Sequence, residues 1–135
     1  MDIRKVTDEL SVAPQIGAAD VAAAAAAGFR SIICNRPDGE APDQTAYADI
    51  EAAATAAGLA IRYQPVRTVS QQDAADFAQA CAELPKPVLA YCRSGTRCIT
   101  LWTVSALDDT PPEQVVAMAK AAGYDMSGIV ASLSR

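Results

Sequence analysis

Val88-Leu89-Ala90-Tyr91-Cys92-Arg93-Ser94-Gly95-Thr96-Arg97 joins an apolar run to a turn of small residues that carries a cysteine and an arginine. Residues 88–91 predict a buried strand, and residues 99–107 predict a helix after the turn. A cysteine at the carboxyl end of a central strand lies where open α/β sheets bind their ligands. This stretch therefore indicates both the fold class and the position of a site.

Apolar runs alternate with helical segments along the rest of the chain. We expect one or two short strands within residues 3–12 and further strands at 31–34 and 59–64. Helices are expected at 18–27, 45–57, 71–84 and 111–122, with a short helix at the end of the chain. Strands separated by helices predict an α/β fold with a mostly parallel central sheet flanked by helices. The length of 135 residues fits one domain, residues 1–135.

Charge and hydropathy exclude several classes of partner. Eleven basic and sixteen acidic residues give a formal net charge of −5, which argues against nucleic acid and anionic membranes as partners. No run approaches the roughly 18 apolar residues of a membrane span, and the N-terminus lacks the apolar core of a signal peptide. The four cysteines show no disulfide-framework spacing. We therefore expect a cytoplasmic protein with reduced thiols.

The absence of histidine narrows the chemistry further. The chain contains no histidine and no Cys-x-x-Cys pair, so we expect no metal site and no cofactor. The same absence excludes Ser-His-Asp and Cys-His catalysis within this chain.

The cysteine of the turn has the surroundings of a nucleophile. Because the turn leads into a helix, the first N–H groups of that helix have no intrahelical partner and carry partial positive charge. Such groups stabilise a thiolate on Cys92 or a bound oxyanion. Gly95 allows the tight backbone turn that points the amides inward.

The side chains of the turn suit an anion as well. Ser94 and Thr96 are small and can donate hydroxyl hydrogen bonds, and the planar fork of Arg97 can hold two oxygens of a phosphate. Arg93 either adds positive field at the mouth of the site or is an ordinary solvated side chain. We predict Arg93, Ser94, Gly95, Thr96 and Arg97 as the phosphate-binding residues. The expected partner is a small anionic or phosphorylated substrate.

Three stretches together resemble a known family. They are residues 10–16 (Leu-Ser-Val-Ala-Pro-Gln-Ile), 28–40 (Gly-Phe-Arg-Ser-Ile-Ile-Cys-Asn-Arg-Pro-Asp-Gly-Glu) and 87–97 (Pro-Val-Leu-Ala-Tyr-Cys-Arg-Ser-Gly-Thr-Arg). In order and spacing they resemble the phosphatase-like domain of beta-lactamase-hydrolase-like proteins, which is related to dual-specificity and tyrosine phosphatases. The resemblance covers nearly the whole chain.

The resemblance implies a dual-specificity-phosphatase-like fold and a cysteine-dependent phosphatase activity on phosphomonoesters. Cys92 would attack phosphorus and form a phosphocysteine, while Arg97 and the loop amides would stabilise the transferring group. A general acid would protonate the leaving oxygen, and water would then release phosphate.

Two departures from the phosphatase pattern keep other functions open. Four residues separate Cys92 from Arg97, where the usual loop has five, and Tyr91 stands where the usual histidine precedes the nucleophile. The shorter loop resembles that of single-domain rhodaneses, which are sulfurtransferases that carry a persulfide on the loop cysteine. A third alternative is an anion-binding regulatory module with little turnover.

The sequence offers no obvious general acid. Residues 65–70, which follow the strand at 59–64, contain no carboxylate. Asp38 and Glu40 follow the strand that ends at Cys34, and their loop reaches the same rim if that strand lies beside the Cys92 strand. Asp38 is the candidate acid, with a plain turn role in Pro-Asp-Gly as the alternative. Asp73 more simply caps the helix that Ser70 opens.

The other cysteines have two interpretations. Related phosphatases sometimes protect the nucleophile as a disulfide, so the resemblance makes Cys34 a candidate redox partner of Cys92, with Cys98 as the rival. The alternative for Cys34 is a small buried hydrophobe. Cys81 shares a helical apolar stripe with Phe77 and is expected in the core. Arg36 is expected either to contact the anion or to pair with a carboxylate.

Overall fold

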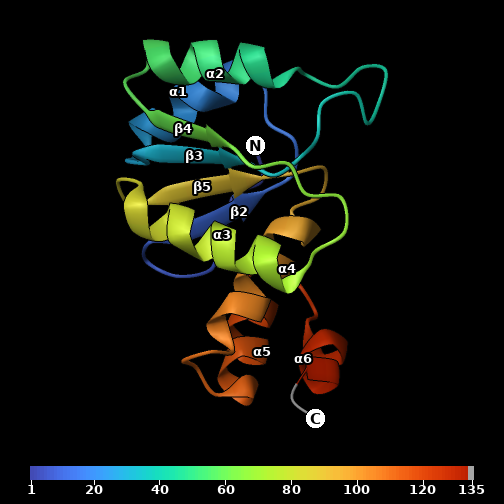
Figure 1. The fold of residues 1–135 in the computed structure, drawn as a ribbon. Coiled ribbons are helices and arrows are strands. Elements are labelled where there is room, and N and C mark those ends of the chain that lie inside the picture. The colour runs from blue at the N-terminus through green and yellow to red at the C-terminus, as the bar shows by residue number, and fades with distance from the viewer. Residues whose placement is uncertain (134–135) are drawn as a thin grey trace.

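The computed structural model describes residues 1–133 as a five-stranded sheet with helices on both faces (Figure 1). The strands are β1 (Arg4–Lys5), β2 (Leu10–Ala13), β3 (Ser31–Cys34), β4 (Ala60–Tyr63) and β5 (Val88–Tyr91). The helices are α1 (Ala18–Ala26), α2 (Tyr47–Ala56), α3 (Gln71–Glu83), α4 (Thr96–Ala106), α5 (Pro112–Ala121) and α6 (Ser127–Leu133). The predicted α/β fold is confirmed.

β5 is the central strand of a mostly parallel sheet. The strand order is β1-β2-β5-β3-β4, and β1, which pairs antiparallel with β2, is the exception to the parallel arrangement. Tyr91 at the end of β5 lies opposite Ala13 of β2 and Cys34 of β3. The carboxyl ends of three strands therefore meet at one edge of the sheet, and the strand that ends at Cys34 lies beside the strand that leads to Cys92.

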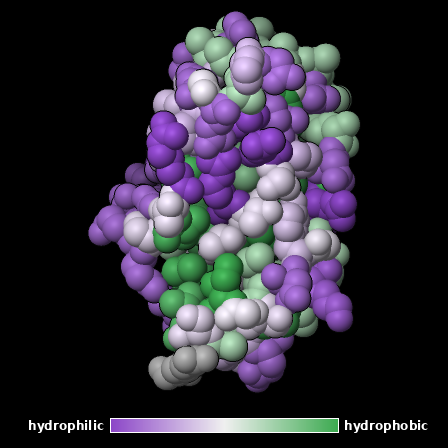
Figure 2. Space-filling model, turned by 90° about the vertical axis from the view of Figure 1, so that its right-hand side faces the viewer, coloured by the Kyte–Doolittle hydropathy of each residue, from purple (hydrophilic) through white to green (hydrophobic). Residues whose placement is uncertain are grey.

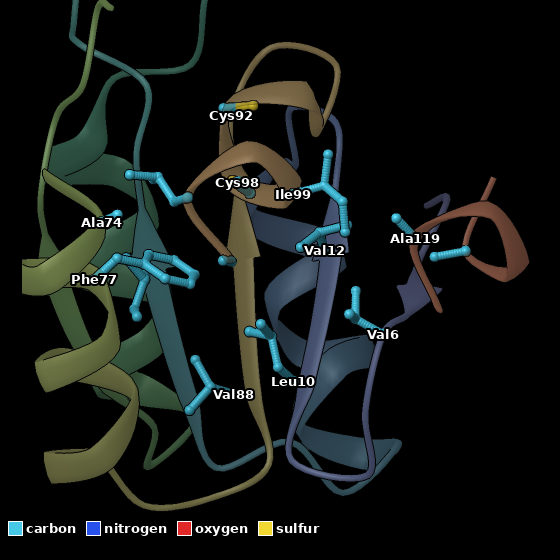
Figure 3. Packing of buried hydrophobic residues seen from close by; sticks show 14 of the residues in the cluster. Val6, Leu10, Val12, Ala74, Phe77, Val88, Cys92, Cys98, Ile99 and Ala119 are labelled. Atoms are coloured by element: carbon cyan, nitrogen blue, oxygen red, sulfur yellow. The ribbon is translucent and has the colours of Figure 1, made fainter. Parts of the chain in front are cut away.

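β5 is buried from both sides, and its side chains alternate between two cores. Leu89 and Tyr91 belong to the core under α1 and α2. Val88 and Ala90 belong to the core on the other face, where they meet Phe77 of α3 and residues of α4 and α5 (Figure 3). A strand covered on both faces explains the uninterrupted apolar run before Cys92.

Local signals set the helix ends. Asp73 donates its backbone N–H to the Ser70 hydroxyl at 3.0 Å and accepts from the Ser70 N–H at 3.1 Å, which confirms the predicted capping box at the start of α3. α4 begins at Thr96, whereas the sequence predicted a start at residue 99. Gly95 has φ of +88° and completes the turn in one residue, so the helix follows at once and Arg97 lies in its first turn.

Residues 1–133 contain neither a candidate membrane span nor a candidate metal site. No helix in this range is long and apolar enough to cross a membrane. Within the same residues, no group of three or more histidine, cysteine or acidic side chains is arranged to hold a metal ion.

Truncation of Leu89 tests the central position of β5. We expect Leu89→Ala to lower the free energy of unfolding by about 2–5 kcal/mol, because this fully buried side chain leaves a cavity beneath α1 and α2. Leu133→Ala is the control, since Leu133 is 43% exposed, and we expect it to change stability by less than about 0.5 kcal/mol. Urea unfolding followed by circular dichroism measures both. Equal losses in the two variants would contradict the assigned core.

Candidate active site

Cys92 lies at the centre of the loop between β5 and α4. Its side chain has no exposed surface, and its sulfur accepts a hydrogen bond from the backbone N–H of Gly95 at 3.1 Å. Its own backbone N–H donates to the carbonyl of Ala13, at the end of the neighbouring strand β2. The loop thus curls around the sulfur, with the first turn of α4 behind it (Figure 3).

These surroundings favour the thiolate form of Cys92. The pKa of Cys92 is lowered to about 5, and the largest cause is a side-chain hydrogen bond with Cys98. Backbone amides of Cys98, Arg97 and Ser94 add to this effect, and together they outweigh the burial that opposes a charge. Cys98 is the protonated partner, because burial raises its pKa well above the ordinary value. The loop therefore holds one buried anion, on Cys92.

Gly95 and Tyr124 fix the shape of the loop. A Cβ atom at Gly95 would overlap the hydroxyl of Tyr124, and the positive φ there is one that other residues rarely adopt. The Tyr124 hydroxyl donates to the backbone carbonyl of Ser94 at 3.0 Å. Tyr124 follows α5 and had no recognisable signal in the sequence, so the structure adds it to the residues that brace the loop.

Arg97 is clamped by a carboxylate that the sequence did not assign to it. Its two terminal nitrogens donate to the two oxygens of Glu40 at 2.8 and 2.7 Å, and one of them also donates to the carbonyl of Val66 at 2.9 Å. The hydrogen bonds that Arg97 donates to Glu40, and then the negative charge on Cys92, raise the pKa of Arg97 further above its ordinary value. Glu40 therefore sets the position of the guanidinium beside the nucleophile.

Glu40 is itself held by a buried arginine. Nε of Arg36 donates to Glu40 at 3.0 Å, and another nitrogen of Arg36 donates to the side chain of Gln15 at 3.1 Å. The hydrogen bond from Arg97 and then that from Arg36 lower the pKa of Glu40 to about 2, against the burial that opposes its charge. Of the two roles expected for Arg36, the structure shows pairing with a carboxylate.

Asp38 lies at the start of α2. Its carboxylate accepts the backbone N–H of Tyr47 at 2.8 Å, and its own N–H donates to the hydroxyl of Tyr63 at 3.0 Å. Asp38 is exposed on the loop that also carries Glu40. The carboxylate that the structure brings to Arg97 is Glu40, and the catalytic role of Asp38 stays a prediction.

The remaining loop side chains surround the mouth of the site. Arg93, Ser94 and Thr96 are exposed, and the hydroxyl of Ser94 donates to that of Thr96 at 2.9 Å. The backbone carbonyl of Arg93 accepts the N–H of Gln15, which ties the loop to the segment after β2. Their predicted roles in phosphate binding stay predictions.

The two candidate redox partners of Cys92 have different surroundings. Cys98 is fully buried, donates its thiol to the Asn35 side-chain oxygen at 3.2 Å, and affects the pKa of Cys92 through a side-chain hydrogen bond. Cys34 instead donates its thiol to the carbonyl of Arg36 at 3.3 Å. All four cysteines are free, so a redox role stays a prediction, with Cys98 the better placed. Cys81, a residue of α3, is half-buried and packs against the core, and this burial raises its pKa to about 12.

A parallel sheet whose central strand ends in a cysteine loop, with an arginine in the first turn of the next helix, defines the class of cysteine-based phosphatase folds. The model of one family within this class, the phosphatase-like domain of beta-lactamase hydrolase-like proteins, matches residues 2–108. The chain belongs to this family, as the three sequence stretches indicated.

Relatives and solved structures agree with this placement. The chain is 36% identical to the beta-lactamase hydrolase-like protein of Agrobacterium fabrum and 34% identical to that of Xylella fastidiosa. The matches cover 97% and 100% of the chain but only 31% and 32% of those proteins, so it spans about a third of their length.

Among crystal structures, a candidate phosphatase from Neisseria meningitidis is 36% identical, with a TM-score of 0.88 over 98% of this chain and 96% of its own. A phosphotyrosine-bound protein from Pseudomonas aeruginosa is 14% identical, with a TM-score of 0.65 over 98% of this chain and 81% of its own, a likeness that shows the fold alone.

The acidity of Cys92 is directly testable. We expect iodoacetamide to alkylate Cys92 with a midpoint near pH 5, measured by mass spectrometry of the Cys92 peptide. Cys98→Ala should raise this midpoint, because it removes the largest contribution to the lowered pKa. Cys81→Ala is the control and should leave the midpoint of Cys92 in place. A wild-type midpoint at the ordinary cysteine value, about 8.5, would contradict the assigned thiolate.

The ion pairs of Glu40 should make stability depend on acid. Because the pKa of Glu40 falls from 4.5 to about 2 on folding, its contribution is present above about pH 4.5 and is lost as the pH falls toward 2, to a limit of about 3 kcal/mol. Glu40→Gln should remove this part of the loss, measured by urea unfolding at several pH values. Glu113→Gln, the same change at an exposed residue, should retain it. An unchanged slope in Glu40→Gln would contradict the clamp.

Proposed function

We propose that the domain hydrolyses phosphomonoesters through a phosphocysteine on Cys92. The observation that carries this proposal is a buried thiolate, with a pKa of about 5, that accepts backbone amides beside the guanidinium of Arg97. The sulfur would form a bond to phosphorus while the bond to the leaving oxygen breaks, and water would then cleave the sulfur–phosphorus bond. The family and the fold support this reaction.

Each loop residue has a defined part in this reaction. The amides that stabilise the thiolate would also receive the phosphoryl oxygens as charge moves from sulfur to the leaving group. Arg97 has five N–H donors, and Glu40 with the Val66 carbonyl fixes its orientation. Arg93, Ser94 and Thr96, at the mouth, would contact the outer oxygens. The proposed substrate is therefore a phosphorylated molecule whose ester oxygen points outward.

The leaving oxygen either receives a proton from a general acid or departs as an anion. Residues 65–70 supply no carboxylate, and Asp73 is engaged in the α3 capping box. Asp38 is the candidate acid, and its carboxylate would have to leave the start of α2 to reach the substrate. The reaction should therefore be fastest with esters of acidic alcohols, such as aryl phosphates, which leave as anions.

Sulfur transfer is the second candidate, and the missing carboxylate favours it. The Cys92 thiolate would attack the outer sulfur of thiosulfate, the sulfur–sulfur bond would break, and sulfite would leave with the electron pair. An acceptor such as cyanide would then remove the sulfur as thiocyanate and restore the thiolate. No step requires a general acid, and the four-residue spacing between Cys92 and Arg97 suits the smaller cargo.

Parallel assays on one set of variants decide between these reactions. We expect wild-type protein to hydrolyse an aryl phosphate and Cys92→Ser to lose at least about a hundredfold in kcat, with a loss of similar size in Arg97→Lys. Cys81→Ser is the control and should retain the wild-type rate. Activity that survives in Cys92→Ser would contradict the proposal.

The same preparations are tested for thiocyanate formation from thiosulfate and cyanide, with the mass of the Cys92 peptide as a second readout. Thiocyanate production together with one added sulfur on Cys92, and no phosphate release, would assign the domain to sulfur transfer. Phosphate binding without either turnover would make it an anion-binding module.

A further inference from the structure

We propose that an apolar groove beside the Cys92 loop binds the hydrophobic part of the substrate, so that the site selects amphiphilic anions. This inference rests on the proposed function, because it assigns a substrate class to the same loop. The groove has a volume of about 500 Å³, within the range of small-molecule sites. Its walls are residues 69–71, one side of α4 and one side of α6, and they include Val69, Thr100, Val104, Ile129 and Leu133.

One face of α4 connects the loop to the groove. Thr96, Thr100 and Val104 are spaced four residues apart, so they follow one another along a single helix face. Thr96 belongs to the loop mouth, and Thr100, which lines the groove, donates its hydroxyl to the Thr96 carbonyl at 2.7 Å. A rise of about 1.5 Å per residue carries this face about 12 Å from the loop.

The facing wall also starts at the site. Val66 accepts the hydrogen bond from Arg97, and Val69 lies three residues farther along the same segment. Ile129 and Leu133, four residues apart on α6, complete the wall. Two of the elements that line the groove, α4 and the segment of Val66 and Val69, therefore also carry or hold the guanidinium of Arg97.

The polarity of the surface changes along this path. Figure 2 views the molecule from the side to which the carboxyl ends of the strands point, and strongly hydrophobic side chains gather in its lower half, below a band of hydrophilic side chains. Val69, Val104 and Ile129 are half-buried, and Leu133 is exposed. An anionic head at the loop and an apolar tail along α4 match this order of charge and hydropathy.

The affinity of the groove for a ligand should increase with the length of the ligand's apolar tail. A buried methylene contributes about fourfold in affinity, so a hexyl chain that lies along α4 should bind at least about tenfold more tightly than an ethyl chain on the same phosphate. Polar side chains on the wall should remove this gain without weakening the ethyl ester, because the head contacts only the loop.

Calorimetric binding of ethyl phosphate and hexyl phosphate to Cys92→Ser tests the inference without turnover. We expect hexyl phosphate to bind at least about tenfold more tightly, and we expect Val104→Asn or Ile129→Asn, added to Cys92→Ser, to bring the ratio close to one. Val116→Asn is the matched control: Val116 is equally half-buried but lies on α5, away from the groove, and its substitution should preserve the ratio.

Equal affinity for the two esters, or a ratio that survives both groove substitutions, would overturn the inference and leave the proposed function standing. A ratio lost in Val116→Asn as well would also overturn it. If neither ester binds, the loop holds no phosphate and both proposals fail. A dimer in analytical ultracentrifugation that Val104→Asn dissociates would assign the groove to a second copy of the chain and overturn the substrate role.

Discussion

The structure depends on holding a negative charge on the buried sulfur atom of Cys92. A buried ion without compensation costs far more than the few kcal/mol that separate folded from unfolded protein. Around Cys92 the compensation comes from loop amides, the thiol of Cys98 and the guanidinium of Arg97. Three backbone features direct hydrogen-bond donors at the Cys92 sulfur. They are the central position of β5, the positive φ of Gly95 and the start of α4 immediately after it.

The charge on Cys92 also explains why distant segments converge. Arg97 is held by Glu40, Glu40 by Arg36, and Arg36 by Gln15, so the segments after β2, β3 and β5 form one hydrogen-bonded chain. Parallel strands make this possible, since their carboxyl ends share one edge. The ion pairs are partly buried, and their main effect is to hold the guanidinium in a single orientation before any ligand binds.

Local patterns made part of this predictable. The strand before Cys92 and the Ser70–Asp73 capping box can be predicted from the sequence, because both depend on residues that are close together in the chain. The pairing of Glu40 with Arg97 joins residues 57 positions apart and requires the strand order, which periodicity does not reveal. The sequence predicts the start of α4 three residues late, because only the backbone at Gly95 shows that the turn ends there. Tyr124 reaches the loop from beyond α5, a contact with no sequence signal.

The two candidate reactions differ in the negative charge that they place on Cys92. Before a ligand binds, Arg36 and Arg97 balance Glu40 and the Cys92 thiolate. A persulfide on Cys92 carries the same single negative charge as the thiolate, so that balance survives sulfur transfer. A phosphocysteine carries up to two negative charges, and its excess must be met by the loop amides and by Arg93 at the exposed mouth. Arg93 is therefore the residue on which phosphate chemistry should depend more strongly than sulfur chemistry.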